Sequence, residues 1–103
     1  MKLATFGYHG IQLPAVTDVS GKTNLHIDLY APASLLPVKV ALISTTGGPE
    51  QAVTVTPTAA GWNSFDIPLA SYTTPTLTVI DQIKLDALPN ATDAVFIDNL
   101  YFW

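Results

Sequence analysis

The chain has 103 residues, which fits one domain, and it carries a net charge of −4 with only four lysine and arginine residues. Such an acidic surface repels phosphate backbones and anionic lipids, which excludes nucleic acid and an electrostatic membrane anchor as expected partners. Hydrophobic residues make up 49% of the chain and charged residues 12%, against roughly 25% charged in an average soluble domain, so some apolar side chains should cover a ligand, a neighbouring domain or a second subunit.

Apolar and polar residues alternate with a period of two, which predicts β-strands that each bury one face. The clearest run is 23–30, where Leu25, Ile27 and Leu29 alternate with polar side chains. Glycine and proline residues interrupt the runs at the spacing typical of a sandwich or barrel. We predict an all-β, antiparallel β-sandwich that forms a single domain over residues 1–103. Its strands are expected at 2–8, 23–30, 38–45, 51–56, 63–67, 82–87 and 94–102, with single helical turns at 15–20 and 69–72.

Three segments of this pattern also carry a resemblance to a known family. They are NLHIDLYAP at 24–32, GWNSFDIPL at 61–69 and FIDNLYF at 96–102. In order and spacing they resemble the jelly-roll carbohydrate-binding modules of the galactose-binding-like superfamily, which are often appended to bacterial polysaccharide-degrading enzymes. The resemblance covers roughly residues 22–103 and implies a jelly-roll sandwich that binds polysaccharide without acting as an enzyme.

The start of the chain departs from that family, whose members usually have further strands before the position of Met1. A missing strand would leave an open sheet edge, so we expect a homodimer or a strand-exchanged oligomer. The first residues lack the apolar run of a signal peptide, and no stretch approaches the ~18 apolar residues of a membrane span. We therefore expect the chain to be part of a longer, secreted extracellular protein.

Three aromatic side chains are candidates for contact with sugar rings, whose faces are apolar and stack on flat aromatic rings. Tyr8 and Tyr30 occupy the polar phase of their predicted strands, and Trp62 follows Gly61 where a strand begins. We predict that Tyr8, Tyr30 and Trp62 stack on carbohydrate. The alternative for each ring is a place in the core or in an interface, where most aromatic side chains are found.

Two pairs of polar side chains alternate outward from predicted strands. His26 and Asp28 share one face of an early strand, and Lys84 and Asp86 share one face of a later strand. If these strands are neighbours, the four side chains form one patch, which we predict to hydrogen-bond sugar hydroxyls. The same patch allows a rival function, a small glycoside hydrolase or other hydrolase in which His26, Asp28 and Asp86 act as acid and base or hold a metal that activates water. A third interpretation is the solvated polar face that is usual for antiparallel sheets.

The resemblance also bears on metal binding. In related modules the aspartate of the last strand often joins a structural calcium site, and Asp98 matches that position. Calcium requires six to eight oxygen ligands, and the early segment that would complete the site is not evident here. No cofactor is required for binding, and a structural calcium at Asp98 is the one candidate ion.

The remaining alternative function is a structural accessory domain that packs against a catalytic domain through an apolar outer face.

Overall fold

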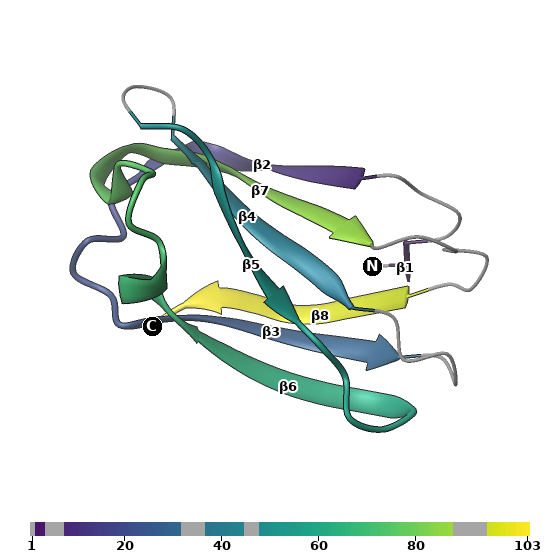
Figure 1. Ribbon diagram of the computed structural model, residues 1–103. Coiled ribbons are helices and arrows are strands. Elements are labelled where there is room, and N and C mark those ends of the chain that lie inside the picture. The colour runs from purple at the N-terminus through teal and green to yellow at the C-terminus, as the bar shows by residue number, and fades with distance from the viewer. Residues whose placement is uncertain (1, 4–7, 32–36, 45–47, 88–94) are drawn as a thin grey trace.

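The computed structural model describes residues 2–3, 8–31, 37–44, 48–87 and 95–103 (Figure 1). Its strands form two four-stranded antiparallel sheets that pack face to face, which confirms the predicted all-β sandwich. Sheet A has the order β1 (Lys2–Leu3), β8 (Val95–Phe102), β3 (Asn24–Ala31) and β6 (Gly61–Pro68). Sheet B has the order β2 (Tyr8–Thr17), β7 (Ile80–Ala87), β4 (Val38–Ser44) and β5 (Gln51–Val55). The jelly-roll topology and the oligomer implied by the resemblance stay predictions.

Strand β2 differs from the sequence prediction, which placed a strand at 2–8 and a helical turn at 15–20. The prediction of that turn was wrong, because residues 15–17 belong to β2, which ends at Thr17. Pro14 looked like a strand breaker, but β2 is an edge strand of sheet B, and an edge strand tolerates a residue that donates no hydrogen bond. A register shift between Gln12 and Thr17 accommodates this segment against β7.

Two short 3₁₀ turns connect β6 to β7. The first, η1 (Leu69–Ser71), confirms the turn predicted at 69–72, whereas the second, η2 (Leu77–Val79), was not predicted. The buried Tyr72 follows η1, and its hydroxyl donates a hydrogen bond of 2.8 Å to the carbonyl oxygen of Val40 on β4. Burial raises the pKa of Tyr72 strongly, so the phenol stays neutral and keeps donating. In the described ranges, no helix is long and apolar enough to cross a membrane.

The core lies between the two sheets, and β3 shows why these residues form it. Leu25, Ile27 and Leu29 are fully buried because alternate side chains of a strand point to the same face. Burying a side chain of this kind stabilises the fold by about 1.5–3 kcal/mol. The core residues that sheet B contributes are Val38, Val40, Leu42, Val55, Ile80, Ile83 and Leu85. The side chains between the buried positions of β3 must then lie on the outer face of sheet A.

Candidate functional site

Three aromatic side chains lie side by side on the outer face of sheet A. Tyr30 on β3 pairs in register with Trp62 on β6 and with Phe96 on β8. The Tyr30 ring centroid lies 5.4 Å from that of Trp62 and 5.8 Å from that of Phe96, and both contacts are edge-to-face. All three side chains are substantially exposed, Trp62 the most at 57%. They line a shallow, wide-open groove of about 350 Å³, and we call Phe96, Tyr30 and Trp62 the aromatic row.

Local structure explains why the row sits at one end of the sheet. Gly61 has a φ of +102°, a conformation that side-chain-bearing residues rarely adopt, and it begins β6 directly before Trp62. From there the side chains of the even-numbered residues of β6 point outward and those of the odd-numbered residues point toward the core, which exposes Trp62 above the groove. Three clustered, exposed rings on a small domain are the kind of apolar surface that marks a binding site.

A second row of side chains lies on the same three strands, two residues from the aromatic row on each strand and about 6.5–7 Å away from it. Asp98, Asp28 and Ser64 pair in register there, and we call them the polar row. The Asp28 carboxylate is its centre and accepts hydrogen bonds from Ser64 Oγ at 2.6 Å, Asn99 Nδ2 at 2.7 Å and His26 Nε2 at 2.9 Å. These bonds lower the pKa of Asp28, that from Ser64 most of all, and keep the carboxylate ionised.

His26 extends the network away from the aromatic row. Its Nε2 contacts Asp28, and its Nδ1 lies 2.7 Å from Asp66 Oδ1. A carboxylate only accepts hydrogen bonds, so the two contacts together favour the imidazolium form, and the pKa of His26 is raised, chiefly by Asp66. The pKa of Asp66 is lowered in turn, mainly by His26 and also by the Trp103 Nε1–H, which donates to it at 3.0 Å. The Tyr101 ring stacks on the imidazole, 4.9 Å away between centroids.

A bulge in β8 makes this arrangement possible. One extra residue of β8 is accommodated between the positions that pair with His26 and Asp28. Asn99 lies there with a φ of 48°, a left-handed conformation that asparagine tolerates better than most residues. The bulge brings the Asn99 amide to Asp28 and turns Tyr101 outward over His26.

The structure divides the predicted four-residue patch between two sheets. His26 and Asp28 lie on β3 in sheet A, whereas Lys84 and Asp86 lie on β7 in sheet B. The prediction of one shared patch was therefore wrong, because alternation along a strand shows which residues share a face but not which strands are neighbours. The backbone of Tyr8 also lies in sheet B, opposite Asp86, and its side chain is outside the part of the chain that the structure describes.

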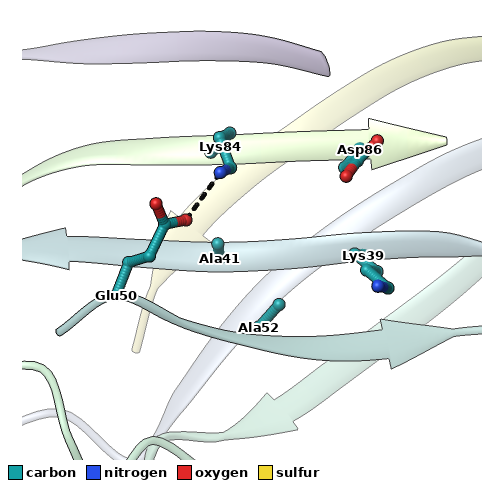
Figure 2. Close-up of a pocket in the computed structure, with 6 residues that line it drawn as sticks. All are labelled: Lys39, Ala41, Glu50, Ala52, Lys84 and Asp86. Carbon is teal, nitrogen blue, oxygen red and sulfur yellow. Dashed lines mark ion pairs between the residues drawn. The ribbon is translucent and has the colours of Figure 1, made fainter. Parts of the chain in front are cut away.

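Lys84 and Asp86 line a separate pocket of about 230 Å³ on the outer face of sheet B (Figure 2). Lys84 Nζ forms an ion pair with Glu50 Oε2 at 2.7 Å, and Asp86 and Lys39 lie at the opposite end of the pocket. The floor consists of the small side chains of Ala41 and Ala52, and no aromatic ring lines it. The pockets on the two outer faces thus differ in that three aromatic rings line the one on sheet A, whereas charged and small side chains line the one on sheet B.

The geometry does not favour the hydrolase alternative. Asp28 and Asp86 lie in different sheets, so they cannot flank one bond as an acid–base pair. Glycoside hydrolysis needs one carboxyl with a raised pKa, and the pKa values of both carboxyls that contact His26 are lowered.

The described ranges contain no cluster of three or more histidine and acidic side chains arranged to hold a metal ion. Asp98 is exposed, and its Oδ1 accepts the Asn99 backbone N–H at 2.8 Å. That bond leaves the carboxylate with further acceptor capacity. A calcium site at Asp98 stays a prediction of the resemblance.

Sequence reasoning missed several residues of the site on sheet A, namely Ser64, Asp66, Phe96, Asn99, Tyr101 and Trp103. Phe96 precedes Asp98 by two residues and Asp66 follows Ser64 by two, so the alternation places each pair on one face. The sequence did not show that β8, β3 and β6 are adjacent strands of one sheet, and this adjacency brings the positions together.

Comparison of the chain with protein-family models, with curated proteins and with solved structures found no match. The function is therefore inferred from the geometry of the face itself. That face offers flat rings in a groove and, directly beside them, ordered groups that accept and donate hydrogen bonds.

Proposed function

We propose that the outer face of sheet A binds carbohydrate, as a recognition module without catalysis. The aromatic row would contact the apolar faces of sugar rings, and the polar row would hydrogen-bond their hydroxyl groups. The single observation that carries this proposal is the register of the two rows. Each ring of the aromatic row has a polar side chain two residues away on the same strand and the same face.

A sugar needs both kinds of contact within a short distance, because each of its rings combines an apolar face with a rim of hydroxyl groups. Asp98 and Ser64 are exposed at the outer strands of the polar row, where they can reach a ligand above the groove. Asp28 between them is held by three donors. An acceptor that is already fixed loses little conformational entropy when a ligand binds, which favours recognition by a rigid sheet.

The alternative of a structural accessory domain predicts a uniformly apolar outer face. Buried centres of protein interfaces are depleted in charged residues. Here carboxylates lie directly beside the rings, and Asp28 is ionised by its own network. Covering this face with an apolar partner would desolvate those charges, which is unfavourable.

The test is titration of the protein with neutral polysaccharides and their oligosaccharides, expected to bind with micromolar to millimolar affinity, roughly −4 to −8 kcal/mol. The Trp62→Ala variant should lose about 2 kcal/mol of binding free energy, about thirtyfold in affinity, because it removes most of one apolar ligand contact. Trp62 is exposed, so the variant should fold. Lys39→Ala on sheet B serves as the control and should bind normally.

Two results would contradict the proposal. One is the absence of binding to every glycan offered. The other is binding that persists unchanged in both Trp62→Ala and Tyr30→Ala, because those two side chains line the groove together with Phe96.

A further inference from the structure

We infer that His26, Asp66 and Trp103 form a pH-sensitive latch, in which the protonated imidazole holds Asp66 where that carboxylate anchors the indole. Loss of the proton opens the contact with Asp66 and frees the indole, and it leaves the contact with Asp28 closed. The latch lies about 13 Å along β3 from Tyr30 and does not depend on the proposed function. Three features carry the inference, namely the number of N–H groups on the ring, the unequal support of the two carboxylates and one shared oxygen atom.

The two contacts of the imidazole require two N–H groups. Nδ1 of His26 lies 2.7 Å from Asp66 Oδ1, and Nε2 lies 2.9 Å from Asp28 Oδ1. Both carboxylates are ionised, because their pKa values are lowered, and an ionised carboxylate only accepts hydrogen bonds. A neutral imidazole has one N–H and one lone pair. After deprotonation one contact therefore sets a lone pair against a carboxylate oxygen, which is repulsive, and that contact opens.

The charges around the ring are otherwise negative. The groups that face it are Asp28 on its own strand, Asp66 on β6 and Tyr101 on β8, whose ring stacks on the imidazole. Asp98 lies opposite Asp28 and adds a further carboxylate to this face. Strands β3, β6 and β8 contain no lysine or arginine. No cation of these three strands can thus replace the proton once it is lost.

Unequal support of the two carboxylates determines which contact opens. Asp28 also accepts hydrogen bonds from Ser64 and Asn99, and its side chain is 17% exposed. Asp66 lies on the edge strand β6 with its side chain 49% exposed, so it can turn toward solvent without leaving a buried charge. The neutral imidazole therefore keeps its remaining N–H on Asp28, and Asp66 moves away.

One oxygen atom couples this movement to the residue that follows β8. Asp66 Oδ1 accepts both the His26 Nδ1–H and, at 3.0 Å, the Trp103 Nε1–H. A carboxylate that turns away from the imidazole thus leaves the indole as well. The Trp103 backbone stays in place, because its N–H donates to the Asn24 carbonyl and its own carbonyl accepts the N–H groups of Thr23 and Asn24. The latch therefore controls the freedom of one side chain and does not unfold the strand.

The raised pKa of His26 fixes the direction of the switch. The latch is closed below the ordinary histidine pKa of about 6.5 and opens as the pH rises through the folded value. The test is hydrogen exchange of the two indole N–H groups, followed by nuclear magnetic resonance from about pH 5.5 to about pH 8.5. Trp62 is the reference in the same molecule, because its side chain is exposed and its N–H has no acceptor among the described residues. We expect the Trp103 N–H to exchange about fivefold more slowly than that of Trp62 at the lower pH and at a similar rate at the higher pH.

Three variants assign the effect to the latch. His26→Gln should make the ratio of the two exchange rates independent of pH, whereas His9→Gln, which replaces the other histidine of the chain, should leave the pH dependence intact. Asp66→Ala should bring the ratio close to one at every pH, because it removes the acceptor of the indole. Asp66 is exposed on an edge strand, so this variant keeps the test valid even if His26→Gln does not fold.

The side-chain amide of Asn99 donates to Asp28 and reports on the other side of the imidazole. Its protection from exchange, corrected for pH, should stay constant through the titration. Loss of that protection while Trp103 stays protected would overturn the inference, because the contact with Asp28 would then be the one that opens. A ratio of the two indole exchange rates that does not change between the two pH values would overturn it as well.

Discussion

Replacing Asp28 by alanine removes one carboxylate that accepts hydrogen bonds from β3, β6 and β8. Ser64 and Asn99 each lose this acceptor, and His26 loses one of its two and keeps Asp66. A hydrogen bond contributes about 0.5–1.5 kcal/mol net, and partial exposure of the network places each of these near the lower end. The expected loss is about 2 kcal/mol of unfolding free energy, which lowers the Tm of a domain of this size by about 10 °C.

The assay is thermal unfolding followed by circular dichroism at pH 6. Ser64→Ala is the matched comparison, because it removes one donor and keeps the carboxylate, so its loss should be about a third as large. The double variant should lose less than the sum of the two single losses, since both substitutions remove the same bond.

The effect must also depend on pH in a defined direction. The pKa of Asp28 is lowered in the folded protein, so its contribution is fully present above the ordinary aspartate pKa of about 3.9. That contribution is lost as the pH falls through the folded pKa, and the difference between wild type and Asp28→Ala should shrink there. A Tm within about 2 °C of wild type at pH 6 would refute the role of Asp28 as the link between the three strands.

The raised pKa of His26 predicts the opposite dependence: its contribution is complete below the ordinary histidine pKa of about 6.5 and is lost as the pH rises through the folded value. Nuclear magnetic resonance titration of the imidazole should give a pKa above 6.5, and an unshifted value would contradict the double contact. Gly61→Ala should destabilise the fold by about 1 kcal/mol or more in denaturant, because a side chain strains the positive φ, and should weaken glycan binding by displacing Trp62; Gly21→Ala, which has the same open space but no positive φ, should do neither. Tyr72→Phe should lose about 1 kcal/mol in the same denaturant assay and leave glycan binding unchanged, because its hydroxyl lies in the core.

The fold was predictable from sequence wherever a strand buries one face completely. The alternation around Ile27 directly reflects burial against the opposite sheet, so the strand, its inner face and the sandwich class all followed. The prediction failed at β2, where Pro14 indicated a break. A proline is a break only inside a sheet, and whether a strand lies at an edge depends on the tertiary arrangement.

The candidate site was predictable only in part, for the same reason. The phase of β3 placed Tyr30 on an outer face, Trp62 was chosen for its place after Gly61 where a strand begins, and the structure exposes both. The order of strands in a sheet has no signature in the alternation, so Lys84 was wrongly grouped with His26, and Phe96 was not joined to Tyr30. The bulge at Asn99 was also not evident, because it depends on the register between β8 and β3 rather than on a local pattern.

That bulge defines which single-residue change the end of β8 can absorb. Deleting Asn99 would remove the extra residue and leave Asp98 opposite Asp28 and Tyr101 opposite His26 in regular antiparallel alternation. Leu100 and Phe102 would keep their places against the core, and the loss would be the Asn99 amide that donates to Asp28. The extra residue is thus a removable insertion in the strand, whose loss would take away one hydrogen bond and leave the inner and outer faces as they are.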